Sequence, residues 1–136
     1  MINNDASVQW NIFGEFGTMN VIAPEVEIGV IDTGVTNHPA LHDSVVSGVD
    51  LITDPISGND GDARDMDPTD PGDYLPVGAD CPNGAVGSNT SSWHGTHVIG
   101  IISMKESEIN LTGVASGVRI SPIRVLGSCG GSLEDV

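Results

Sequence analysis

One segment limits the possible folds more than any other: a mainly apolar run from Val26 to Ile31 that ends at Asp32. Near-continuous apolar character over so short a segment is typical of a strand buried on both faces of a parallel sheet. Thr33 and Gly34 then turn the chain. Open α/β sheets build their sites at the carboxyl ends of such strands, so Asp32 is the first candidate site residue. The segment predicts an α/β fold with a parallel sheet.

Two further strands are expected in the same sheet. One runs from Val45 to Ile52 and is weakened by Gly48, and the other runs from Val118 to Leu126. Pro122 gives this last strand a residue without a backbone N–H. It is tolerated only if the missing donor falls at an edge or a bulge.

A helix is expected from about Trp93 to Met104, and either Ser91 or Ser92 can cap its start. Gly95 and Gly100 each cost about 1 kcal/mol relative to alanine inside a helix, which indicates that another backbone packs closely there. The apolar stripe of this helix consists of Val98, Ile99, Ile101 and Ile102.

From residue 53 to residue 89 the chain is dominated by Asp, Gly, Pro and Asn, which predicts a long ordered loop. Calcium prefers about six to eight oxygen ligands, and closely spaced carboxylates on such a loop can supply them. A solvated acidic loop without an ion is the alternative, because the spacing does not fit an EF-hand. The candidate ligands, not all of them expected to bind, are Asp60, Asp62, Asp65, Asp67, Asp70 and Asp73.

The charge balance excludes two classes of partner. With 19 acidic and 4 basic residues, the net charge of -15 repels nucleic-acid phosphates and anionic membrane surfaces, so neither is expected to bind. No apolar run approaches the length of a membrane-spanning helix, and the first residues resemble no signal peptide. Self-repulsion of this size also opposes compaction, so bound cations or a salty medium are expected to offset part of it, with calcium as the first candidate cation.

Cys81 and Cys129 lie in sequence rich in Gly and Asn, without the second Cys or His pair of a structural zinc site. This context favours a disulfide over two free thiols. Such a bond would close a long loop and contribute about 4 kcal/mol in the chain-entropy model. It would also place the protein outside the cytoplasm.

Taken singly, Asp32 and His94 are ambiguous. An acid at a strand end is more often a turn former or a helix cap. His94 is expected in the first turn of the helix, where an imidazole can face a carboxylate. His94 and His97 could instead share a metal ion with Asp32, but the glutamate usual beside the first histidine of a zinc helix is absent. His97 is therefore expected to be a packed histidine whose ring is hydrogen-bonded to backbone.

Two motifs, taken together and in this order, remove the ambiguity. The first is Ile31-Asp32-Thr33-Gly34 followed by His38-Pro39, and the second is His94-Gly95-Thr96-His97-Val98 with Gly100. They resemble the aspartate and histidine signatures of the subtilisin-like serine peptidases. The acidic segment 65–73 resembles an insertion in secreted bacterial members, and segments 113–115 and 120–131 are similar to the family's next strand and turn.

The resemblance implies a subtilisin-like three-layer α/β fold with a parallel sheet, incomplete in this chain. Residues 1–136 would be the amino-terminal portion of a single peptidase catalytic domain, with an acidic insertion at about 53–90. His94 would be the general base and Asp32 would orient it, whereas the family's serine and oxyanion-hole asparagine have no counterpart here. Ser132, a capping residue at the start of a further helix, predicts that the polypeptide continues.

The implied function is a secreted serine endopeptidase that hydrolyses peptide bonds in proteins or peptides and contains structural calcium. Its second partner would be the remainder of its own catalytic domain. Because loss of the serine costs about 10⁶ in kcat in such enzymes, this chain alone is expected to be inactive. The alternative is a catalytically inactive calcium-binding or remnant module on the same scaffold.

Overall fold

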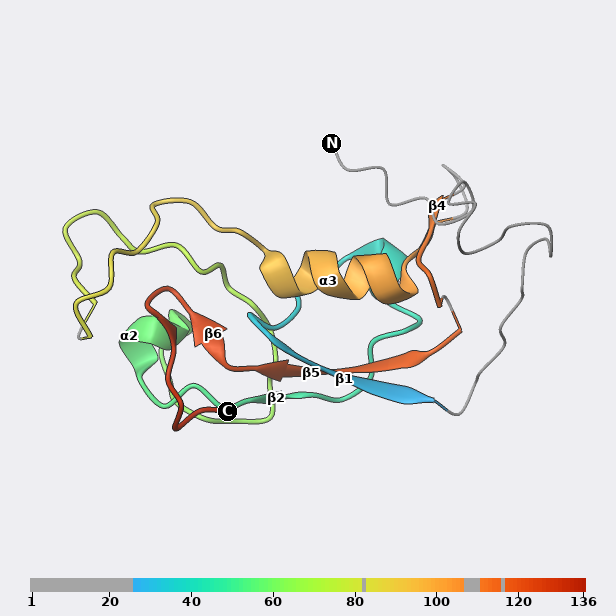
Figure 1. Cartoon of the computed structure of the whole chain (residues 1–136), viewed down its shortest axis with the longest axis horizontal. Helices are drawn as coiled ribbons and strands as arrows, with labels where there is room; N and C mark the ends of the chain where they lie inside the picture. Colours follow the sequence, from blue (N-terminus) through green and yellow to red (C-terminus); the bar gives the residue numbers. More distant parts are fainter. Residues whose placement is uncertain (1–25, 82, 107–110, 116) are drawn as a thin grey trace.

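A three-stranded parallel sheet organises the protein (Figure 1). The structure, a computed structural model, describes residues 26–81, 83–106, 111–115 and 117–136. Strand β1 (Glu27–Asp32) and strand β2 (Val49–Asp50) lie on either side of strand β5 (Arg119–Arg124), and both pairings are parallel. The parallel sheet expected from the run that ends at Asp32 is therefore confirmed.

The expected strand from Val45 to Ile52 is interrupted in its middle. The backbone N–H groups of Val46 and Leu51 donate to the carbonyls of Ile120 and Arg124, at 2.8 and 2.9 Å. Between these bonds lies Gly48, whose Cβ, if it had one, would be 2.2 Å from the carbonyl oxygen of Pro122. Pro122 has no donor to offer on this side, so the ladder breaks here and β2 is only two residues long.

Helix α3 (His94–Ser103) covers one face of the sheet (Figure 1). It packs against β1, β5 and the short 3-10 helix η2 (Pro39–Leu41). Ile99 and Ile120 at the centre of this interface are 0% exposed. The remaining buried members of the core are Val30, Val35, Leu41 and Val118.

The opposite face of the sheet is not covered by a helix of the described part of the chain. Val30 is buried beneath α3, whereas the side chain of Ile31, which points the other way, is 56% exposed. The expectation of a strand buried on both faces is thus met on one face only. The described residues supply two layers of the expected three.

The expected helix bounds differ from α3 by one residue at each end, but the expected caps are wrong. The residue before α3 is Trp93, which has a left-handed backbone (φ 53°) and makes no side-chain capping bond. Neither Ser91 nor Ser92 occupies the cap position. At Ser132 a hydroxyl accepts from the N–H of Glu134 at 3.1 Å, yet the segment forms a turn and not a helix in the described residues.

The remaining strands form two short antiparallel hairpins. Strand β3 (Lys105–Glu106) pairs with β4 (Leu111–Thr112), and β6 (Leu126–Gly127) pairs with β7 (Gly130–Gly131). The expected strand from Val118 to Leu126 is therefore divided between β5 and β6. None of the helices in the described ranges is both long and apolar enough to cross a lipid bilayer.

Arg124 attaches the acidic loop, residues 53–89, to the end of the sheet. Its side chain is 1% exposed, and its guanidinium pairs with the carboxylates of Asp50 and Asp60 and donates to the carbonyl of Gly58. Gly58 is the last residue of a short helix, α2 (Pro55–Gly58), in a region that was expected to be a loop. A fully buried arginine with two carboxylates is a strong structural constraint, because each charge needs the others.

The pKa values of the two carboxylates that pair with Arg124 shift in opposite directions. Burial raises the pKa of Asp50, whose side chain is 3% exposed, and the facing guanidinium only partly offsets this. Burial acts in the same direction on Asp60, but that side chain is 26% exposed and the guanidinium prevails, so its pKa lies below the ordinary value. Depth of burial therefore decides the sign for two acids that share one partner.

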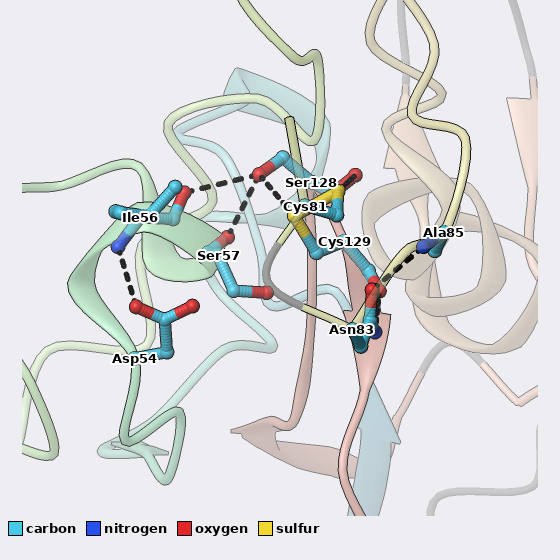
Figure 2. The surroundings of a disulfide bond; sticks show 8 residues. All are labelled: Asp54, Ile56, Ser57, Cys81, Asn83, Ala85, Ser128 and Cys129. Carbon is cyan, nitrogen blue, oxygen red and sulfur yellow. Dashed lines mark hydrogen bonds between the residues drawn. A yellow bond between two sulfur atoms is a disulfide. The ribbon is translucent and has the colours of Figure 1, made fainter. Parts of the chain in front are cut away.

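A disulfide joins Cys81 to Cys129, 48 residues later in the chain (Figure 2). Cys129 lies in the turn between β6 and β7, and both cysteines are buried beside Leu75. Next to the bond, the hydroxyl of Ser128 donates to the carbonyl of Ile56 at 3.1 Å, as Figure 2 shows. The disulfide and α2 thus stabilise the same end of the molecule.

Candidate active site

Asp32 lies at the carboxyl end of β1, where its side chain is 10% exposed. The backbone carbonyl of Asp32 accepts from the N–H of Val125 at 2.9 Å, which fixes this end of the strand to the chain just after β5. One carboxylate oxygen accepts from the N–H of Thr33 at 2.7 Å. Asp32 is therefore a largely buried carboxylate with a fixed orientation.

His94, the first residue of α3, faces Asp32. Its Nδ1 lies 2.9 Å from one carboxylate oxygen and 2.8 Å from the other. The imidazole is 63% exposed, so one edge is bound and the rest is open. Because Nδ1 is engaged by the carboxylate, Nε2 is the nitrogen that can exchange a proton with another group. The structure thus brings the two sequence-predicted catalytic residues into direct contact.

Gly95 permits this close approach of helix and strand end. A Cβ at this position would lie 2.2 Å from the carbonyl oxygen of Gly34 and 3.2 Å from the Cβ of Asp32. Gly34 itself has φ of +92°, a left-handed conformation that favours glycine. The close backbone packing expected at both helix glycines is confirmed at Gly95 and wrong at Gly100, where an added Cβ would have no neighbour within 4 Å.

A second buried acid lies behind the pair. Asp70 is 3% exposed, and its two oxygens accept from the hydroxyl of Thr33 at 2.9 Å and from the N–H of Gly72 at 2.8 Å. The Thr33 oxygen in turn accepts from the N–H of Gly95 at 3.0 Å. Burial raises the pKa of Asp70, and the two hydrogen bonds offset this only in part. Asp70, one of the six candidate calcium ligands, lies against the active-site turn.

Asp73, another expected calcium ligand, contacts the segment that leads into α3. Its carboxylate accepts from the N–H of Ser92 at 2.5 Å and from the hydroxyl of Ser92 at 2.6 Å. Burial alone would raise the pKa of Asp73, but the bonds from Ser92 outweigh it and hold the pKa below the ordinary value. Asp73 therefore contacts the chain just before His94, and Asp70 is linked through Thr33 to Gly95, the residue just after it.

The other expected calcium ligands are dispersed. Asp60 pairs with Arg124. Asp65 accepts from the N–H of Asp67 at 2.8 Å, and Asp67 accepts from the N–H of Thr69 at 3.0 Å. Among the residues that the structure describes, no three His, Cys, Asp or Glu side chains are grouped to hold a metal ion. The six carboxylates are therefore not arranged around a common calcium position in the described residues.

His97 lies on the side of α3 turned away from the sheet. It is exposed and lines a pocket of about 330 Å³ with Trp93 and Met104. The expectation of a packed histidine is therefore wrong, because the buried face of α3 is formed by residues such as Thr96, Ile99 and Ser103, and His97 is not part of it. The metal site that His97 could have formed with Asp32 and His94 is not assembled in the described chain.

The roles of two residues were not predicted from the sequence. Thr33 belongs to the aspartate motif, but its link to Asp70 depends on a long-range parallel bridge between Val35 and Thr69 that no local spacing reveals. Arg124 did carry a signal. A charged residue inside a strand that is otherwise apolar is almost never buried without partners, and few residues besides the acids of the loop could supply them.

The motifs and their geometry agree with comparisons to known proteins. Residues 24–136 match the Subtilase family. An extracellular protease of Xanthomonas campestris is 40% identical over 80% of this chain, and an extracellular basic protease of Dichelobacter nodosus is 35% identical over 98%. A protease of Pseudoalteromonas arctica has a similar structure, with a TM-score of 0.72 and 38% identity over 84% of this chain.

A more distant structure, the epidermin leader peptide processing serine protease of Staphylococcus aureus, has a TM-score of 0.51 and 26% identity over 81% of this chain and 22% of its own. The present chain spans 19% and 24% of the two curated relatives and 33% of the Pseudoalteromonas protease. The fold and both motifs are therefore found in a chain much shorter than these proteins. The chain belongs to the Subtilase family.

Proposed function

We propose that the full-length protein is a serine endopeptidase whose triad consists of Asp32, His94 and a serine that follows Val136. The observation that carries the proposal is the contact between His94 Nδ1 and the Asp32 carboxylate at 2.8 Å, in a chain of the Subtilase family. The substrates would be proteins or peptides. A noncatalytic calcium-binding module would not require an imidazole with one nitrogen bound to a carboxylate and the other exposed.

In this mechanism His94 Nε2 removes the proton from the serine hydroxyl while the serine oxygen attacks the carbonyl carbon of the peptide bond. His94 then donates that proton to the departing amine, and the acyl group stays on the serine. A water molecule then attacks the acyl carbon while His94 takes its proton, and His94 returns that proton to the serine oxygen as the acid product is released. Asp32 accepts a hydrogen bond from Nδ1 throughout, which fixes the tautomer and stabilises the imidazolium.

Fluorophosphonate labelling tests this function directly. The full-length protein should react stoichiometrically, because a serine activated by His94 displaces fluoride from the probe and becomes phosphonylated. Intact-mass analysis of the labelled protein should show one adduct, and peptide mapping should place it on a serine after Val136. Absence of an adduct, with the protein shown to be folded, would favour the noncatalytic module.

We further propose that the full-length protein is secreted. The disulfide between Cys81 and Cys129 would persist in an oxidising environment, and two relatives are named extracellular proteases. The net charge of -15 opposes binding to nucleic acids and anionic membranes, so neither is proposed as a partner. The remainder of the catalytic domain is the proposed partner of the exposed sheet face at Ile31.

Calcium binding by the acidic loop stays a prediction from the sequence. Of the six candidate ligands, Asp62, Asp65 and Asp67 are exposed and do not contact Arg124 or the active-site turn. A divalent cation there would offset part of the negative charge of the loop. The prediction therefore rests on these three, although the described structure does not group their side chains to hold an ion.

Chelation should lower the melting temperature by a few degrees, because an ion bound only to the folded state stabilises it by mass action. Differential scanning fluorimetry with calcium and with EGTA measures the shift. Asp62→Asn should reduce it, whereas Asp43→Asn, an exposed acid outside the loop, should not. An identical melting curve in calcium and EGTA would remove the predicted site.

A further inference from the structure

The start of α3 carries His94 but lacks a cap of its own. The first N–H groups of a helix have no partner within it, and a side chain just before the helix usually accepts from one of them. Trp93 occupies that place and makes no such bond. The acceptor comes instead from the turn after β1, where the hydroxyl oxygen of Thr33 accepts from the N–H of Gly95 at 3.0 Å. Thr33 thus caps α3 from outside the helix.

The orientation of the Thr33 hydroxyl is set by Asp70. An ionised carboxylate only accepts, so at 2.9 Å the Thr33 hydroxyl must donate its proton to Asp70. Its lone pairs are then left to receive the N–H of Gly95. The N–H of Gly72 occupies the second Asp70 oxygen at 2.8 Å, so the carboxylate cannot turn away. Asp70 and Thr33 are 3% and 4% exposed, which keeps water from replacing either bond.

The backbone around Asp70 is fixed to the same turn. The N–H of Val35 donates to the carbonyl of Pro68, and the N–H of Asp70 donates to the carbonyl of Val35, both at 3.0 Å. The carboxylate is therefore supported by two main-chain bonds as well as by Gly72. One short part of the acidic segment is rigidly attached to the strand end that carries Asp32.

We propose that Asp70 is a positioning residue that acts through Thr33 to hold the first turn of α3, and with it the His94 imidazole, within hydrogen-bond distance of Asp32. The proposal rests on the proposed peptidase function. Thr33 contacts both sides of the pair, because its N–H binds Asp32 and its hydroxyl binds the helix. A small displacement of a catalytic group can cost about 10²-fold in rate, so loss of this link is felt in the chemical step.

An asparagine at position 70 cannot replace the aspartate. Two donors converge on Asp70, one on each oxygen, and an amide offers only one acceptor oxygen. If the amide oxygen of the Asp70→Asn variant accepts from the Gly72 N–H, its NH₂ group must donate to the Thr33 oxygen, which reverses that bond and leaves the buried Thr33 hydroxyl proton without an acceptor. If the amide is turned the other way, its NH₂ group faces the Gly72 N–H, donor against donor. Thr33→Val has nearly the same shape as threonine but removes the cap and leaves the Gly95 N–H without its acceptor. Thr33→Ser keeps the hydroxyl.

The experiment measures kcat, KM and the rate of fluorophosphonate inactivation for the full-length protein and four variants. We expect Asp70→Asn and Thr33→Val to lower kcat about tenfold or more with little change in KM, because the loss concerns the transition state. Thr33→Ser should recover most of that loss. Asp43→Asn, the same chemical change at a side chain 92% exposed, is the matched control and should resemble the wild type.

A double variant tests whether the two residues act on one path. Since Asp70 acts only through Thr33, Asp70→Asn should reduce kcat little further when Thr33 is already valine. Multiplicative losses, or a lower melting temperature with unchanged kcat at a temperature where the variants are folded, would overturn the proposal. Thr33→Ser behaving like Thr33→Val would overturn it too.

A readout independent of turnover separates this proposal from the proposed function. The proton between His94 Nδ1 and Asp32 should give a far-downfield signal in the proton NMR spectrum of the wild type, Thr33→Ser and Asp43→Asn. It should be lost or shifted in Asp70→Asn and Thr33→Val. A wild type that shows this signal but no fluorophosphonate adduct contradicts the peptidase function alone. An unchanged signal in all variants contradicts the positioning role alone.

Discussion

Replacing His94 with alanine should lower kcat of the full-length protein by about 10⁶-fold, the largest effect expected of any single change in this chain. The alanine leaves the serine without a base and Asp32 without a partner, while substrate binding by the rest of the cleft remains. KM should therefore change little. Hydrolysis of a peptide substrate under saturating conditions, together with fluorophosphonate labelling, measures the loss.

His97 provides the matched control for that variant. It lies one turn further along α3, is exposed, and has no contact with Asp32 in the described structure. His97→Ala should keep kcat within a few-fold of the wild type. If His94→Ala retained substantial activity, or if both variants lost it equally, His94 could not be the general base. Asp32→Asn should fall between them, with a loss of about 10⁴-fold.

Replacing Arg124 with methionine should give the largest loss of stability, about 3–5 kcal/mol in the free energy of unfolding. Methionine fills much of the same volume but leaves the carboxylates of Asp50 and Asp60 and the carbonyl of Gly58 without their common donor. An unpaired buried charge accounts for most of the loss. Urea unfolding followed by circular dichroism measures it.

The same strand supplies the control. Arg119, five residues earlier in β5, is 54% exposed and pairs with Glu27 at 3.7 Å. Arg119→Met should change the free energy of unfolding by no more than about 1 kcal/mol, because exposed ion pairs contribute little. Equal effects of the two substitutions would show that the buried network at Arg124 is not what holds the acidic segment. Adding Asp50→Asn to Arg124→Met should recover part of the loss, since it removes the most deeply buried unpaired charge.

The parts of this structure that follow from the sequence are those with a local signal. The apolar run that ends at Asp32 and the apolar stripe of α3 each indicate which residues are buried. The glycine beside His94 indicates a close backbone contact. The pairing of Asp32 with His94 also followed, because both residues lie in motifs whose order along the chain matches a known family.

What could not be read from the sequence depends on long-range contacts. Six closely spaced aspartates have the same local pattern whether they bind an ion, pair with a distant arginine or support a helix start. Asp60 pairs with the distant Arg124, at the end of β5. Asp70 supports the start of α3 through Thr33, which follows the end of β1. The break at Gly48 likewise depends on which residue of the neighbouring strand lies opposite, and that residue is a proline.

The disulfide between Cys81 and Cys129 affects what a cut in the chain would do. Val86, 99% exposed, lies in a surface loop that a protease can reach. A peptide bond broken there leaves two pieces that remain covalently joined, because the cut falls between the two cysteines. The piece with Asp32 thus keeps the piece with His94, and such a molecule would run as one band on a gel until a reductant separates it into two.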